Sequence, residues 1–197
     1  MTARIVLMLS FTAEMTYWVK PFWHKEELDV ITGATPLDAV TGATSVAGAD
    51  EIPGLWDMFI GFRGGSLGET SNLALLIGFA FLVFTRVIRI VTPVAFIGTV
   101  AIGAFIAGAD VGLHVFGGGL FLGAVFMATD YSTTPVSMKG KFVFGVGCGL
   151  ITLVIRFFSD MPEGVSFAIL IMNILTFYID KVTFPKPFGA VKGGHKK

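Results

Sequence analysis

LALLIGFAFLVFTRVIRI, residues 73–90, is a long and almost uninterrupted apolar segment. It carries no charge before Arg86, and a helix needs roughly 20 apolar residues to cross the hydrocarbon core of a bilayer. Charged residues make up 14% of the chain, against about 25% in an average soluble protein. The sequence therefore predicts an all-α integral membrane protein.

Further apolar segments lie on both sides of this stretch. Together the segments cover residues 5–19, 72–90, 92–108, 111–129, 141–158 and 164–181. They predict about six transmembrane helices in a single membrane domain, 1–197. The fourth segment contains Gly117, Gly118 and Gly119, a run that allows either close helix contact or a local unwinding in a membrane bundle.

The basic residues orient these spans, because cytoplasmic loops are enriched in lysine and arginine. With Met1 on the cytoplasmic side, ten of the fourteen basic residues are cytoplasmic, and Lys20, Lys25, Arg63 and Arg156 are not. We expect a multi-pass protein of the cell inner membrane with both termini cytoplasmic. Residues 20–70 form one long extracytoplasmic loop and 182–197 a cytoplasmic basic tail. The zero net charge gives no reason to expect a nucleic-acid partner.

Cys148 is the single cysteine, so the chain alone can form no disulfide and no iron–sulfur cluster. Its apolar, glycine-rich surroundings predict a small buried thiol. We predict no metal site and no catalytic residue in this chain.

The long loop contains a repeated motif, DVITGATPLDAVTGATS at residues 29–45. Two copies of D-x-x-T-G-A-T end at Thr35 and Thr44. A threonine hydroxyl here can be esterified by a phosphate group, because Gly33 lets the backbone approach closely and Ala34 leaves the hydroxyl uncrowded. Asp29 could orient a metal or a donor group during that modification. The same residues also suit an ordinary Gly/Pro turn, and both interpretations stay open on residue types alone.

This motif resembles the flavinylation motif of the NqrB/RnfD family, the membrane subunits of the Rnf and sodium-pumping NADH:quinone oxidoreductase complexes. Three more stretches are similar to family segments: GGSLGETSNLALLIG (64–78), FMATDYSTTPVSMKGKFVFG (126–145) and MPEGVSFAILIMNILTFYID (161–180). A-T-P-L-D at 34–38 is similar to the RnfD branch of the family. The family is longer at its N-terminus by about four helices, so this chain resembles the C-terminal part of its bundle.

The resemblance implies an electron-transfer membrane subunit of an Rnf-type ferredoxin:NAD⁺ oxidoreductase, which couples electron flow to Na⁺ or H⁺ translocation. It implies FMN bound covalently to Thr35 through a phosphoester, with Thr44 as the alternative, and a second flavin such as riboflavin. Implied partners are the A, B, C, E and G subunits of the Rnf complex, membrane lipid and a flavin transferase for maturation. Such a translocase subunit is not expected to be catalytic alone.

Three acidic residues outside the motif are further candidates. Glu69 either approaches the flavin or caps the next helix together with Thr70 and Ser71. Asp130 and Glu14 are candidates for an ion path, because ionisable groups within or at the ends of spans often serve transport. Asp130 is equally compatible with a solvated helix end, and Glu14 with a shallower first span.

Two other function classes remain. A channel or solute transporter without redox function would suit the glycine-interrupted spans. A purely structural membrane scaffold is the third possibility. Covalently bound flavin would distinguish the leading interpretation from both.

Overall fold

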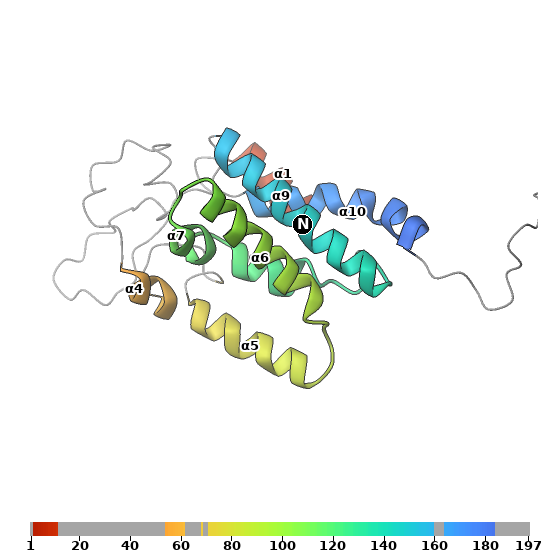
Figure 1. Cartoon of the computed structure of the whole chain (residues 1–197), viewed down its shortest axis with the longest axis horizontal. Coiled ribbons are helices and arrows are strands. Elements are labelled where there is room, and N and C mark those ends of the chain that lie inside the picture. The colour runs from red at the N-terminus through yellow and green to blue at the C-terminus, as the bar shows by residue number, and fades with distance from the viewer. Residues whose placement is uncertain (1, 12–53, 62–67, 69–70, 160–163, 184–197) are drawn as a thin grey trace, which may run out of the picture.

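The computed structural model describes residues 2–11, 54–61, 68, 71–159 and 164–183, and these contain helices but no strand. Nine helical elements, labelled as in Figure 1, follow one another along these residues: α1 (Thr2–Ser10), α4 (Leu55–Ile60), α5 (Asn72–Phe84), α6 (Val91–Ile106), α7 (Val111–Phe116), α8 (Leu120–Leu122), the π-helix η1 (Gly123–Met127), α9 (Met138–Phe158) and α10 (Gly164–Thr183).

Helices α6, α9 and α10 form the centre of the bundle, and α9 packs on both of the others (Figure 1). Two glycines on α9 bring it close to α6. A Cβ atom at Gly145 would lie 2.7 Å from the carbonyl oxygen of Thr92, and one at Gly149 would lie 2.6 Å from the Cβ of Thr99. Small residues spaced four apart are the usual means of close helix contact in membranes, where no hydrophobic force drives helices together.

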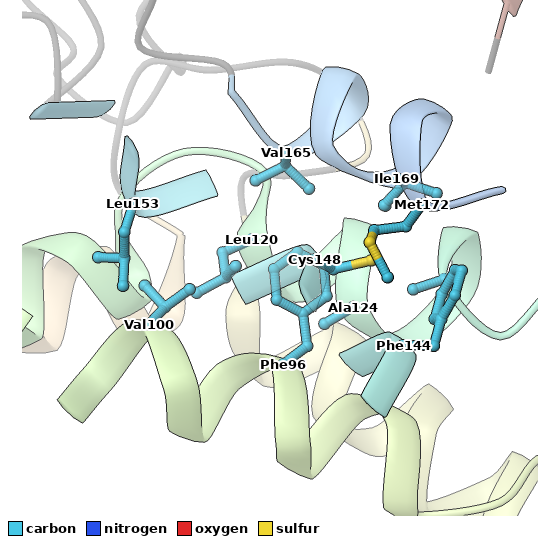
Figure 2. Close-up of a cluster of buried hydrophobic side chains, with 11 residues drawn as sticks. Phe96, Val100, Leu120, Ala124, Phe144, Cys148, Leu153, Val165, Ile169 and Met172 are labelled. Carbon is cyan, nitrogen blue, oxygen red and sulfur yellow. The ribbon is translucent and has the colours of Figure 1, made fainter. Parts of the chain in front are cut away.

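A hydrophobic core surrounds the single cysteine. Figure 2 shows side chains from α6, α9, α10 and the α8–η1 segment facing one another around Cys148, which is fully buried. The largest members are Phe96 and Phe144, both inaccessible to solvent. The prediction of a small buried thiol at Cys148 is confirmed.

The outer surface of the bundle is also apolar. Phe84, Phe105, Ile106 and Phe177 are between 71% and 88% exposed. Exposed apolar area on this scale is rare on a soluble monomer and common on a surface that faces lipid. Helices α9 and α10 are long and apolar enough to cross a membrane, whereas α5 and α6 are apolar but shorter.

Helices α5, α6, α9 and α10 correspond to the predicted spans 72–90, 92–108, 141–158 and 164–181. Two features differ from the prediction: the end of α5 and the continuity of the span 111–129. Helix α5 ends at Phe84 and not near residue 90, because the backbone turns at Thr85, whose hydroxyl donates to the Phe81 carbonyl. The predicted span 111–129 is broken into α7, α8 and η1. Gly117 is extended and Gly118 has a φ of 65°, so the glycine run unwinds the helix, as one of the two predicted alternatives required.

Candidate functional site

The predicted flavin residues lie outside the described part of the chain. This applies to the motif residues Asp29, Gly33, Ala34, Thr35 and Thr44, and also to Glu14 and Glu69. Their roles stay predictions. The structure instead describes α1, which precedes residues 12–53 in the sequence, and α4, which follows them.

One side-chain amide, that of Asn72, joins three helices. Asn72, only 1% exposed, donates from Nδ2 to the carbonyl oxygens of Met58 (3.2 Å) and Phe116 (3.1 Å). It thereby joins α4, α5 and α7. Both acceptors are helix-end carbonyls that would otherwise need another partner in a buried place. Asn72 follows Ser71, whose side chain caps α5 by accepting from the Ala74 N–H.

Aromatic rings continue this connection into the bundle. Trp56 and Phe59 of α4 meet edge to face, and Phe59 meets Phe116 of α7 in the same way, with centroids 5.8 Å apart. Phe116 then stacks on Phe121 at 5.8 Å. Leu55, Trp56 and Ile60 on the other face of α4 are exposed, which fits a short helix lying at the membrane interface.

A buried cation lies at the same end. Arg156, 3% exposed on the last turn of α9, donates from Nη1 to the carbonyl oxygen of His114 at 2.6 Å. Helix α7 ends two residues after His114, so this carbonyl lies in its last turn, where a positive charge is favourable. The His114 ring packs against Phe157 with centroids 5.4 Å apart. Asp110 caps the other end of α7 by accepting from the N–H groups of Gly112 and Leu113.

Asp130 lies at the opposite end of the fourth span. Its carboxylate is exposed and accepts hydrogen bonds from the hydroxyls of Ser132 (2.9 Å) and Thr133 (3.5 Å). The loop that follows is held on α10, because the Thr176 hydroxyl donates to the Thr133 carbonyl. Asp130 therefore helps to order a turn at the bundle end, and its place on an ion path stays a prediction.

The described residues contain no cluster of three or more histidine, cysteine, aspartate or glutamate side chains that could hold a metal ion. The fit of FMN depends on Thr35 and Thr44, which are not among those residues. What the described part shows is a set of buried hydrogen bonds around α4 and α7, and α4 is the helix that follows the motif-bearing segment in the sequence.

Two residues of this support are not apparent from the sequence pattern. Charge counting groups Arg156 with the extracytoplasmic loops, yet it is buried between α7 and α9. Its place within an apolar run is the available signal, because an arginine inside a span normally has a specific partner. Asn72 gives no comparable signal, because an asparagine at the start of a helix is ordinary.

Comparison with known proteins identifies relatives over nearly the whole chain. A model of the family described as "NQR2, RnfD, RnfE family" matches residues 1–189. The D subunit of the Na(+)-translocating ferredoxin:NAD(+) oxidoreductase complex of Acetobacterium woodii is 38% identical over 194 residues, which are 98% of this chain and 58% of that protein.

Two further relatives agree. The D subunit of the proton-translocating ferredoxin:NAD(+) oxidoreductase complex of Clostridium ljungdahlii is 38% identical over 94% of this chain and 59% of its own length. The D subunit of an ion-translocating oxidoreductase complex of Stutzerimonas stutzeri is 35% identical over 96% of this chain and 62% of its own. The chain thus spans less than two thirds of the length of these relatives.

Proposed function

The chain belongs to the NQR2, RnfD, RnfE family, and from this premise we propose that it acts as an electron-transfer membrane subunit of an Rnf-type ferredoxin:NAD⁺ oxidoreductase. The observation that carries the proposal is the combination of 38% identity to the D subunits of two such complexes with the D-x-x-T-G-A-T motif. The family places the protein in a membrane, in agreement with the apolar exterior of the bundle.

The proposed prosthetic group is FMN, esterified through its phosphate to Thr35, with Thr44 as the alternative. FMN exchanges both one and two electrons, and the protein sets its position and surroundings. In this proposal Gly33 and Ala34 keep the attachment site open, Asp29 assists the modification, and Glu69 is the candidate that approaches the flavin. A second, non-covalent flavin such as riboflavin is part of the proposal.

The residues of the described part would hold this loop in place. Asn72 ties α4 to α5 and α7, and Arg156 holds the last turn of α7. A covalently tethered group can transfer electrons only if its attachment is steady relative to its partners, because a small displacement greatly slows reaction. These buried hydrogen bonds tie α4, the helix that follows residues 12–53 in the sequence, to α5 and α7, and α7 to α9.

The remaining steps need other proteins. We propose that the A, B, C, E and G subunits of the Rnf complex supply the clusters and the nicotinamide site, that a flavin transferase attaches FMN, and that the assembly lies in the inner membrane. About six spans place both termini in the cytoplasm and residues 20–70 outside. Electron flow drives Na⁺ or H⁺ across, with Asp130 and Glu14 as candidates for the ion path.

A channel or solute transporter is the second candidate. The break at Gly117–Gly119, followed by the π-helix η1, favours it, because discontinuous helices commonly line substrate sites in transporters. A transporter would have no use for a covalently bound flavin.

The experiment is in-gel flavin fluorescence of the denatured chain, produced in a host that carries a flavin transferase. We expect fluorescence that stays with the band, that Thr35→Val abolishes it and that Thr44→Val keeps it. The reverse result for the two variants would move the site to Thr44. A wild-type band without fluorescence would refute the flavin proposal and favour the transporter.

A further inference from the structure

The turn between α5 and α6 forms one wall of an open pocket of about 480 Å³. Met138, the first residue of α9, also lines it. Two side chains of the pocket are arginines and the rest are apolar: Val83, Arg86, Ile88, Arg89, Ile90, Val91 and Met138. A concave surface with two cations and hydrophobic walls suits a ligand that has an anionic head and an apolar body.

The backbone of this turn holds Arg86 in an unusual conformation. Helix α5 ends in a Schellman motif, in which the Arg86 N–H donates to the Val83 carbonyl (2.9 Å) and the Val87 N–H donates to the Leu82 carbonyl (3.0 Å). The motif requires a left-handed residue, and Arg86 has a φ of 57°, the only positive φ of a non-glycine residue among those described. An L-residue with a side chain is strained there.

Helix α6 ends in the same motif, but with glycine at the left-handed position. The same pair of hydrogen bonds joins Gly108 to Phe105 (3.1 Å) and Ala109 to Ala104 (3.0 Å). Here the left-handed residue is Gly108, with a φ of 69° and open space around it. Strained non-glycine residues that persist are concentrated at binding sites, so the arginine at the equivalent place in α5 indicates that its side chain has a use.

The electrostatic surroundings of the pocket favour an anion. Within the described part of the chain, neither Arg86 nor Arg89 is held in an ion pair. Helix α6 begins beside them with no side-chain cap on its first N–H groups, and its N-terminus adds partial positive charge. Lys139, exposed at the start of α9, adds another cation close to Met138.

The pocket lies at one end of the bundle, where a bilayer crossed by α9 and α10 would have its headgroups. The α5–α6 turn is at the same end of the bundle as the start of α9 and the end of α10 (Figure 1). Phe84 and Val87, next to the pocket, are 88% and 68% exposed, so the apolar surface continues from the pocket onto the lipid-facing side. If the phosphate of a phospholipid contacted the arginines, its acyl chains would therefore lie against these apolar side chains.

We propose that this pocket binds one anionic phospholipid, whose phosphate contacts Arg86 and Arg89 and whose acyl chains lie against Val83, Ile90 and Met138. An acidic segment of a partner protein would satisfy the arginines but would place polar backbone on the apolar wall, which is costly. The arrangement of charge and apolar surface therefore fits a lipid better.

Native mass spectrometry of the full chain in detergent tests the proposal, with phosphatidylglycerol and phosphatidylcholine of identical acyl chains as probes. We expect a preference for phosphatidylglycerol. Arg89→Gln should reduce that preference about fivefold, the effect of one basic residue near an anionic membrane surface. Lys181→Gln, an exposed cation of α10 outside the pocket, should leave it unchanged. Glycerol phosphate without acyl chains should not displace the lipid.

Arg86→Gly separates binding from folding. Glycine relieves the left-handed strain, so we expect an unchanged or higher Tm together with about a fivefold lower preference for phosphatidylglycerol. An equal affinity for both lipids, or a preference that survives Arg86→Gly combined with Arg89→Gln, would overturn the proposal.

A photo-crosslinking residue in place of Met138 identifies the occupant in native membranes. We expect adducts with the mass of a phospholipid. Adducts with another protein chain would overturn the lipid assignment and point to a subunit interface at this pocket.

Discussion

Arg156 and His114, 42 residues apart in the sequence, meet through a 2.6 Å hydrogen bond from the guanidinium to the backbone carbonyl. The bond joins the end of α9 to the last turn of α7, and both residues are at least 95% buried. A carbonyl buried in an apolar bundle cannot form a hydrogen bond with water, so it needs a partner within the protein. The bond therefore attaches α7, a short helix that ends at the glycine run, to α9.

Arg156→Met tests this contact. The substitution removes the donor and leaves the His114 carbonyl buried without this partner, so we expect the free energy of unfolding to fall by about 1–3 kcal/mol. Thermal unfolding in detergent should show a lower Tm. Lys181→Met removes an exposed charge from α10 and should leave the Tm close to wild type. An unchanged Tm for Arg156→Met would show that the bond does not stabilise α7.

Asn72→Asp tests the bridge between α4, α5 and α7. A carboxylate has no N–H donor and would place negative charge beside the Met58 and Phe116 carbonyls, so we expect a loss of about 1–3 kcal/mol. Hydrogen exchange of the α4 amides should become faster. Ser71→Ala, one residue away, removes only the α5 cap and should leave exchange in α4 unchanged. Equal exchange in Asn72→Asp and wild type would contradict the assigned role.

Gly149→Ala tests the close packing of α6 on α9. The added methyl group would lie 2.6 Å from the Thr99 Cβ, so the helices must separate, and we expect a cost of about 1–3 kcal/mol. Gly98→Ala is the matched control on α6, because a Cβ there meets nothing within 4 Å. Alanine favours helix over glycine, so this control should be neutral or stabilising. The two variants would unfold alike if the contact were unimportant.

Asp130→Asn tests the ion path. An amide oxygen can still accept from Ser132, so the turn should remain folded. Under the proposed function, the loss of charge should remove most ion uptake by the proposed complex. Uptake of labelled sodium and of protons, driven by reduced ferredoxin in inverted vesicles, measures this. Asp180→Asn, whose carboxylate accepts from the Val136 N–H in the same region, serves as the control. Normal ion uptake by Asp130→Asn would contradict a place for Asp130 on the ion path and leave it only the role of ordering the turn.

Cysteine labelling tests the topology. Cys148 is the single cysteine and fully buried, so background labelling should be low. We expect Ser45→Cys to react with a membrane-impermeant maleimide on intact spheroplasts, and Lys192→Cys to react only after the membrane is opened. Labelling of Ser45→Cys that also requires opening would place the D-x-x-T-G-A-T motif in the cytoplasm.

Much of the helical framework could be predicted from the sequence. The predicted spans 92–108, 141–158 and 164–181 correspond to α6 at Val91–Ile106, α9 at Met138–Phe158 and α10 at Gly164–Thr183. Long apolar runs form helices in a bilayer because every backbone polar group must be bonded within the segment. The glycine run at 117–119 left close helix contact and local unwinding open, and the structure shows the unwinding.

The candidate site could be predicted only as a motif. Thr35, Thr44 and Asp29 stand out through a repeated pattern and through family resemblance, and they lie outside the described residues. Asp130 is described, and the structure shows its turn but not its function.

The helical, apolar character of the chain and its membership of a membrane family follow from the sequence, because hydrophobic length and motif spacing are local properties. The fold was needed to show that Arg156 is a buried partner of α7, that Asn72 joins three helices and that Arg86 stands in a left-handed turn beside a pocket. The contacts of Arg156 and Asn72 depend on carbonyls that the fold brings close from 42 and 44 residues away. The turn at Arg86 is local, and the fold adds Met138 of α9 to the pocket beside it.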